Sequence, residues 1–118
     1  MINVASTAQT LSNDYAVLAG WIGLATPNGQ DPSGPPVEIP AGASGYRRAQ
    51  ITWNPSGGGV NVGNAVTISA PAGEYKFAIL CTESDPTQPG DRLIDYCAID
   101  AQLNSDGTVV VTPQYTQT

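Results

Sequence analysis

The sequence predicts a mainly β protein: a single-domain β-sandwich or jelly roll preceded by a short N-terminal helix. The 13 glycines and 10 prolines are spread along all 118 residues, as turns between short strands would place them. The apolar runs are short and regularly spaced, and about six or seven of them fit strands, which is typical of both architectures. Because no linker or repeat interrupts this pattern, we expect one domain over residues 1–118.

A helix is expected within residues 1–20, because apolar residues there recur at alternating intervals of four and three. Ser6 and Gln9 have the spacing of a capping box, and Gly20 fits a C-terminal stop. A strand that starts near Tyr15 is the competing interpretation. The apolar stripe consists of Val4, Ala8, Leu11, Tyr15 and Leu18.

After the helix, apolar runs predict strands that are separated by polar turns. A long loop rich in Pro and Gly is expected over residues 27–44, a polar loop over 83–91 and a turn at 105–107. Residues 113–118 are expected to form a polar tail, because Pro113 cannot donate a hydrogen bond to a sheet. The expected strands are Trp21–Thr26, Tyr46–Trp53, Val62–Ser69, Tyr75–Thr82, Leu93–Leu103 and Val109–Val111.

The charge balance limits the classes of partner. A net charge of −6, from 10 acidic and 4 basic residues, argues against nucleic acid and against an anionic membrane surface. Charged residues make up only 12 % of the chain, which favours a protein that covers part of its surface with partners. The first basic residue is Arg47, so we expect no secretory signal segment, and residues 15–25 are too few to span a bilayer. We expect a chain made in a cytoplasm.

Catalytic chemistry has few candidates in this sequence. There is no histidine, which excludes a Ser-His-Asp triad, a Cys-His pair and a His-rich metal site. The glycines at 57–59 lie between two expected strands, so they do not form a phosphate-binding loop. Cys81 and Cys97 are interpreted as small buried residues, and one disulfide is the alternative. We therefore expect no cofactor, no metal site and no enzymatic activity.

The acidic residues between positions 83 and 95 are the remaining candidates for catalysis or cation binding. Two carboxylates at a suitable separation hydrolyse glycosidic bonds in many enzymes, and Ca²⁺ is held by several oxygen ligands. Neither chemistry has a recognisable motif here, so a solvated acidic loop is the favoured interpretation. These residues are Glu83, Asp85, Asp91 and Asp95.

Four other side chains have two interpretations each. Arg47 and Arg48 are adjacent in an expected strand, so one can pair inside the sandwich while the other points outward. The outward arginine would either contact an acidic partner or be ordinary surface charge. Trp21 and Trp53 are interpreted as core anchors, and a sugar-stacking platform is the alternative.

Three segments together resemble small virion proteins of tailed phages that infect actinobacteria. The first segment is 21–26, which follows the helix, and the second is 45–53, with its Gly-Tyr-x-Arg pattern. The third spans 75–103 and holds two strands joined by a loop. The loop at 83–90 departs from the family pattern because it is acidic and rich in proline. The family includes head decoration, minor tail and tail-fibre-like proteins, and the resemblance implies a β-sandwich that assembles on a virion.

The resemblance implies two roles. A head decoration protein would bind the major capsid protein on the capsid exterior as a homo-oligomer, with a trimer as the expected form, and would stabilise contacts between capsomers. A minor tail or tail-fibre component would bind tail proteins and the host surface, and a carbohydrate-binding module is a further alternative. We expect the decoration role and a virion location. The candidate interface residues are Asn28, Asp31, Val37, Arg47, Arg48 and Tyr115.

Overall fold

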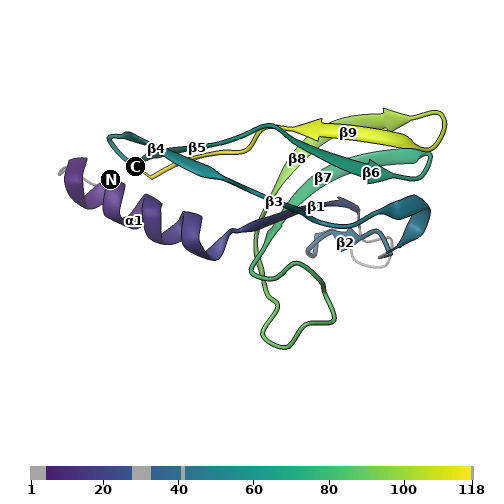
Figure 1. Ribbon diagram of the computed structural model, residues 1–118, viewed down its shortest axis with the longest axis horizontal. Coiled ribbons are helices and arrows are strands. Elements are labelled where there is room, and N and C mark those ends of the chain that lie inside the picture. Colours follow the sequence, from purple (N-terminus) through teal and green to yellow (C-terminus); the bar gives the residue numbers. More distant parts are fainter. Residues whose placement is uncertain (1–4, 28–32, 41, 118) are drawn as a thin grey trace.

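The computed structural model describes residues 5–27, 33–40 and 42–117, and it has the predicted class: mainly antiparallel β structure with one N-terminal helix (Figure 1). The molecule is elongated, with principal extents of 46 × 28 × 28 Å. The elements are α1 (Ala5–Leu18), β1 (Trp21–Thr26), β2 (Val37–Glu38), a 3₁₀ turn (Ala43–Gly45), β3 (Ala49–Gln50), β4 (Trp53–Gly57), β5 (Val60–Gly63), β6 (Val66–Ala70), β7 (Gly73–Cys81), β8 (Leu93–Leu103), β9 (Gly107–Val111) and β10 (Gln114–Thr116).

The expected helix forms and ends at Leu18, just before Gly20, but its predicted apolar stripe is only partly buried. Ala8 and Ser12 are 3 % and 0 % exposed, whereas Leu11 and Leu18 remain 43 % and 44 % exposed. The helix turns its face of small residues inward because the Ser12 hydroxyl accepts a hydrogen bond of 2.7 Å from the buried amide of Asn61. A stripe defined by hydrophobicity alone does not include such a polar contact.

The predicted capping box does not form, because the helix already includes Ser6. The Gln9 side chain instead reaches the hairpin between β4 and β5. Its Oε1 accepts a hydrogen bond from Gly59 N, and its Nε2 donates one to the carbonyl of Val60. This residue therefore ties α1 to the strands beneath it.

The larger sheet has the strand order β2-β1-β7-β8, with β3 also paired to β1. All of its pairings are antiparallel, and the register between β1 and β7 places Trp21 opposite Cys81 and Ala25 opposite Phe77. The long strand β8 lies at the edge of this sheet, where β7 is its paired neighbour within the described residues.

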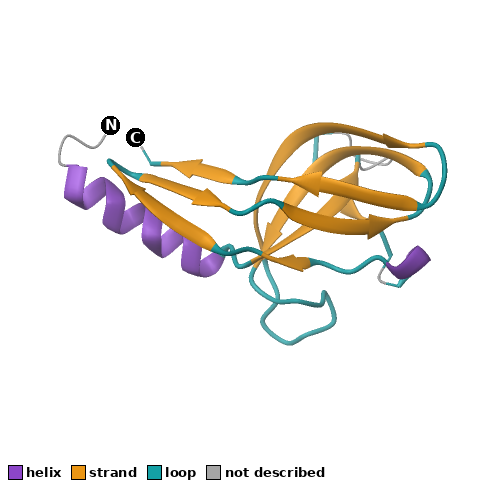
Figure 2. Ribbon diagram, turned by 45° about the horizontal axis from the view of Figure 1, so that its top comes forward, coloured by secondary structure: helices purple, strands orange, loops and turns teal. Residues whose placement is uncertain are grey.

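The second layer is made of two small sheets that continue into each other. The chain passes from β5 into β6 and from β9 into β10, so β10-β5-β4 and β6-β9 form one long twisted ribbon. Figure 2 shows α1 against the three-stranded part of this ribbon and the β6-β9 part over the larger sheet. Apolar side chains of β6 and β9 join those of β1 and β7 in one core, which includes Ile22, Leu24, Ile68, Ala78, Leu80 and Val109.

Several predicted segments have different bounds. The expected loop at 27–44 contains β2 and the 3₁₀ turn, and the expected strand at 46–53 is divided between β3 and β4. The expected strand at 62–69 is broken between Gly63 and Val66, where the Asn64 side chain accepts a hydrogen bond from Thr52 N. The breaks arise because one stretch of chain leaves one sheet and joins the other.

The predicted polar tail at 113–118 is ordered structure in part. Pro113 ends β9, as its missing N–H predicts, but the chain then forms β10 against β5. The turn at 105–107 is present, yet β8 and β9 on its two sides pair with different partners. It therefore connects the two layers, and it does not close a hairpin.

Candidate functional site

A buried cluster of charges lies where the loop at 82–92 meets the larger sheet. Arg48 is 6 % exposed, and its guanidinium forms ion pairs with Glu38 at 2.8 Å and with Asp91 at 2.7 Å. The same guanidinium donates a hydrogen bond of 2.8 Å to the carbonyl of Glu83. Because Glu38 lies on β2 and Asp91 lies in the loop, one side chain joins two segments that are far apart in sequence.

The Tyr46 hydroxyl extends this cluster into β1. It donates a hydrogen bond of 2.6 Å to Glu38 and accepts one of 3.0 Å from Leu24 N. Burial raises the pKa of Tyr46 well above its usual range, and the hydrogen bond to Glu38 adds to the effect. Burial lowers the pKa of Arg48, but its hydrogen bonds to Glu38 and Asp91 outweigh burial and raise it overall. Both groups therefore keep their protons in the folded chain.

Gly23 leaves the room that this cluster needs. A Cβ atom at this position would collide with the Tyr46 hydroxyl and would lie 2.9 Å from Glu38 Oε2. The side chains cross directly over the backbone of β1, so only glycine fits beneath them.

Beside the charge cluster lies a cavity of about 420 Å³ with a mixed polar and apolar lining, which we call the Trp21 hollow. It is lined by β1, by residues 42–48 and by the loop after β7. Trp21 is half-buried and forms one wall, whereas Tyr46 and Arg48 are buried. The other lining residues are Gly42, Arg47, Ser84 and Asp85.

A second cavity, of about 360 Å³, opens between β8 and the chain from β9 to β10, and we call it the edge cleft. Ile22, Leu80 and Ile99 contribute apolar lining, and Tyr15 and Asp95 are joined across it by a hydrogen bond of 3.0 Å. The Tyr15 ring also stacks on Tyr115, with centroids 3.6 Å apart. The cleft is therefore an open side of the sandwich between two strand edges.

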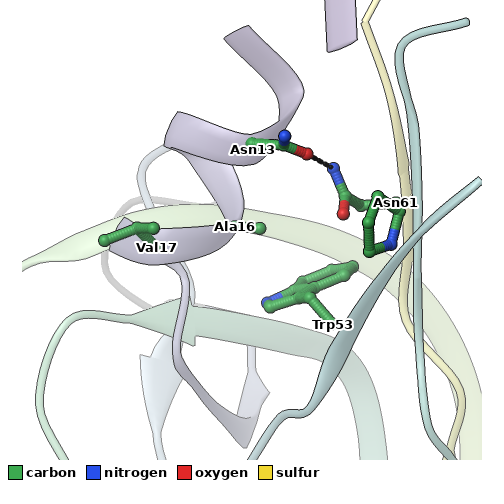
Figure 3. Close-up of a pocket in the computed structure, with 6 residues that line it drawn as sticks. Asn13, Ala16, Val17, Trp53 and Asn61 are labelled. Carbon is green, nitrogen blue, oxygen red and sulfur yellow. Dashed lines mark hydrogen bonds between the residues drawn. The ribbon is translucent and has the colours of Figure 1, made fainter. Parts of the chain in front are cut away.

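A third cavity, of about 250 Å³, lies between α1 and the strands β4 and β5. Figure 3 shows the amides of Asn13 and Asn61 meeting above the Trp53 ring, and their hydrogen bond is 3.0 Å long. The Trp53 indole N–H donates to the carbonyl of Ala19, and its ring packs against the core. These polar groups hold α1 in place.

The candidate interface residues lie in different environments. Arg47 is exposed and Val37 is 50 % exposed, whereas Arg48 is buried with its charge paired inside the chain. The two arginines thus point to opposite sides, as their adjacent positions predict. Tyr115 is half-buried against Tyr15. The other two candidates, Asn28 and Asp31, lie outside the described residues.

The acidic residues between 83 and 95 do not converge on one point. Asp91 pairs with Arg48, Asp95 accepts from Tyr15, and Asp85 accepts from Thr87. The backbone N–H of Thr87 and its hydroxyl lower the pKa of Asp85. Within the described residues, no group of three or more His, Cys, Asp or Glu side chains could hold a metal ion.

The two cysteines are free thiols on neighbouring strands. Cys81 is buried, as expected, and burial raises its pKa to about 11. The expectation that both are buried is wrong for Cys97, which is exposed because β8 is an edge strand. Among the described elements, no helix has the length and apolar character to cross a membrane.

The residue that sequence reasoning missed is Glu38. It lies between Val37 and Ile39 in an otherwise apolar triplet, and an acid in such a position is a signal for an inward-facing charge with a partner. The partner itself was not recognisable, because Arg48 comes ten residues later, just before a different strand, β3.

In comparisons with known proteins, no family model, no curated protein and no solved structure matches this chain.

Proposed function

We propose that this chain is a bacteriophage virion structural protein, a head decoration protein that binds the major capsid protein on the capsid exterior. The observation that supports the proposal is the edge cleft, which lies between two strand edges. Strand edges carry backbone N–H and C=O groups that pair readily with an added strand. A capsid segment in extended conformation would pair with β8 and place its apolar side chains in the cleft.

The surface around β8 supports the same role. Leu93 and Tyr96 on this strand are 40 % and 41 % exposed, so the edge strand presents apolar side-chain surface to a partner. The chain has few charges with which to bind a partner, so apolar contact and backbone pairing are the means available to it. The proposal includes a homo-oligomer on the particle, with a trimer as the expected form.

A tail location is the second candidate, and the Trp21 hollow favours it. Trp21 and Tyr46 line this cavity together with Arg47, and a cavity that combines aromatic and polar groups suits a ligand on a host surface. In this alternative the chain is a minor tail or tail-fibre component.

A density map of the purified virion tests the proposal. We expect the domain at repeated positions on the outer capsid, in contact with the major capsid protein through β8. Density for this chain at the tail alone would replace the proposal by the second candidate. Absence from the whole particle would overturn both.

A binding assay on particles that lack the chain tests the surface. The variants Leu93→Lys and Tyr96→Lys should fail to attach, because each places a charge in the apolar contact. Val17→Lys is the matched control, since Val17 is 82 % exposed on α1 and lines the cavity between α1 and the strands β4 and β5, not the edge cleft. Equal attachment of all three variants would exclude β8 as the contact.

A further inference from the structure

We propose that the Trp21 hollow is a binding site for a neutral pyranose sugar, with the Trp21 indole as the stacking surface. Arg47, Ser84 and Asp85 would be its hydrogen-bonding partners. The inference goes beyond the proposed structural role, because it assigns a ligand class to a cavity that particle assembly does not require.

The cavity has a suitable size and a mixed lining. Its volume of about 420 Å³ lies within the range of roughly 300–1,000 Å³ that is usual for small-molecule sites. A pyranose ring has C–H groups on its face and hydroxyl groups around its edge. The indole of Trp21 supplies a flat apolar surface for the face, and Arg47, Ser84 and Asp85 line the same cavity as partners for the hydroxyl groups of the edge.

The polar residues can satisfy hydroxyl groups in both directions. A sugar hydroxyl both donates and accepts, so its site needs donors and acceptors side by side. Arg47 is exposed, makes no ion pair with any described residue and supplies N–H donors. Asp85 uses Oδ1 to accept from Thr87, and its Oδ2 accepts no hydrogen bond from a described residue.

The charges in the hollow favour a neutral ligand. Arg48 is paired with two carboxylates, Glu38 and Asp91, which do not line the hollow, so Arg47 and Asp85 are the lining charges without such a partner, one positive and one negative. An anionic ligand would meet repulsion from Asp85 that offsets its attraction to Arg47, and a cationic ligand would meet the reverse. A ligand without charge meets neither penalty.

The charge cluster also makes the hollow rigid before any ligand arrives. Arg48 binds Asp91 and the carbonyl of Glu83, so it holds the loop that carries Ser84 and Asp85 against the sheet that carries Trp21. A site whose walls are fixed in advance loses less entropy on binding. The buried ion pairs would therefore preorganise the binding site in addition to stabilising the fold.

An NMR titration of the full-length ¹⁵N-labelled chain tests the inference. The probes are the methyl pyranosides of glucose, galactose, mannose and rhamnose, with glucuronate and glucosamine as charged counterparts. At least one neutral sugar should shift the Trp21 indole N–H and the amides of Ser84 and Asp85 in a saturable way. We expect a dissociation constant on the order of 1 mM, as for a small site with few contacts. The Trp53 indole N–H should not move.

Variants separate the proposed contacts from general effects. Arg47→Ala and Asp85→Asn are exchanges in polar side chains outside the core, so both chains should fold, and each should weaken sugar binding about tenfold, the loss of about 1.4 kcal/mol. Trp53→Phe is the matched control for Trp21→Phe, and only Trp21→Phe should lower the affinity.

Any of three results would overturn the inference. They are no saturable shift at Trp21 with any neutral sugar, tighter binding of a charged counterpart than of the neutral sugars, and sugar affinities of the Arg47 and Asp85 variants equal to that of the natural chain. Any of them would also remove the support that the Trp21 hollow gives to a tail location, whereas the decoration role rests on the edge cleft and is tested separately by the density map.

Discussion

Arg47 and Arg48 are neighbours in the sequence, yet they lie in opposite environments. Arg48 is buried between two carboxylates, whereas Arg47 is exposed. A buried charge is tolerated only when partners replace the water it loses. Glu38 and Asp91 do so here, and removing the arginine would leave both carboxylates facing each other without a counter-charge.

We predict that Arg48→Met lowers the free energy of unfolding by about 3 kcal/mol, the usual cost of breaking a buried ion pair from one side. Arg47→Met should change it by less than about 0.5 kcal/mol, since it removes only an exposed charge. Urea unfolding of both variants at neutral pH measures the difference. Similar values for the two variants would contradict the assignment of Arg48 as the paired residue.

Tyrosine burial predicts a loss of stability at alkaline pH. Burial raises the pKa of Tyr46 and of Tyr15 above the usual value, so the folded chain keeps protons that the unfolded chain releases. The stabilising effect is complete below the unfolded pKa of about 10 and is lost as the pH rises above it. Each such tyrosine contributes a slope of about 1.4 kcal/mol per pH unit.

The unfolding free energy of Tyr46→Phe should fall less steeply with rising pH than that of the natural chain. The difference in slope should be the contribution of one tyrosine, about 1.4 kcal/mol per pH unit. Tyr96→Phe is the control, because Tyr96 is 41 % exposed. Urea unfolding at several pH values between about 9 and 11 gives the slopes. An unchanged slope in Tyr46→Phe would show that its hydroxyl is not held neutral by burial.

At the scale of elements, β1 is the strand that most depends on a missing side chain. It pairs with β2, β3 and β7, and Gly23 lies at its centre beneath the Tyr46 hydroxyl. A side chain there would push the charge cluster away from the sheet. The charge cluster in turn holds the loop at 82–92. The geometry of this loop therefore depends on a glycine in β1, a strand that is not adjacent to the loop in the sequence.

We predict that Gly23→Ala destabilises the fold by about 1–3 kcal/mol, the usual cost of an extra group in a filled interior. Gly20→Ala is the matched control, since no atom lies within 4 Å of the place of its Cβ. Thermal unfolding of both variants measures the effect. Equal melting temperatures would mean that Tyr46 and Glu38 can move aside at no cost.

At the scale of the whole molecule, low charge and exposed apolar side chains act together. A net charge of −6 keeps copies apart at neutral pH, although Leu93 and Tyr96 are exposed on an edge strand. As carboxylates gain protons in acid, this repulsion weakens and the strand edge becomes free to pair.

We therefore predict that self-association of the purified chain increases as the pH falls from 7 towards 4. Leu93→Lys should reduce it, because a lysine on an edge strand opposes pairing. Val17→Lys adds the same charge on α1 and serves as the control. Light scattering across the pH range measures the association. Equal association of the two variants would contradict this prediction.

Local sequence patterns were sufficient to predict the class of the fold, the N-terminal helix and the longest strands. The alternation of Phe77, Ile79 and Cys81 in β7, and the prolines and glycines between strands, are local signals that can be read without any tertiary contact. Tyr75 was expected on the same face, but it joins the other core cluster because the register between β7 and β8 shifts between Tyr75 and Phe77. The sequence also predicts that one of Arg47 and Arg48 points inward and the other outward, which they do, although both residues precede β3 and lie in no strand. Burial of Cys97 was wrongly expected, because a pattern of residues does not tell an edge strand from a central one.

The layers and the candidate site could not be predicted from local patterns, because both depend on contacts between distant segments. Arg48 pairs with both Glu38 and Asp91, and Trp21 and Asp85 line one cavity. These residues belong to segments that are far apart in the sequence, and no local pattern indicates that the segments meet. The same holds for β10, which forms in a polar tail because β5 offers it an edge. Local patterns indicate the secondary structure and burial that each residue favours. A site, in contrast, is formed by contacts between residues that are distant in the sequence, and these contacts depend on the whole fold.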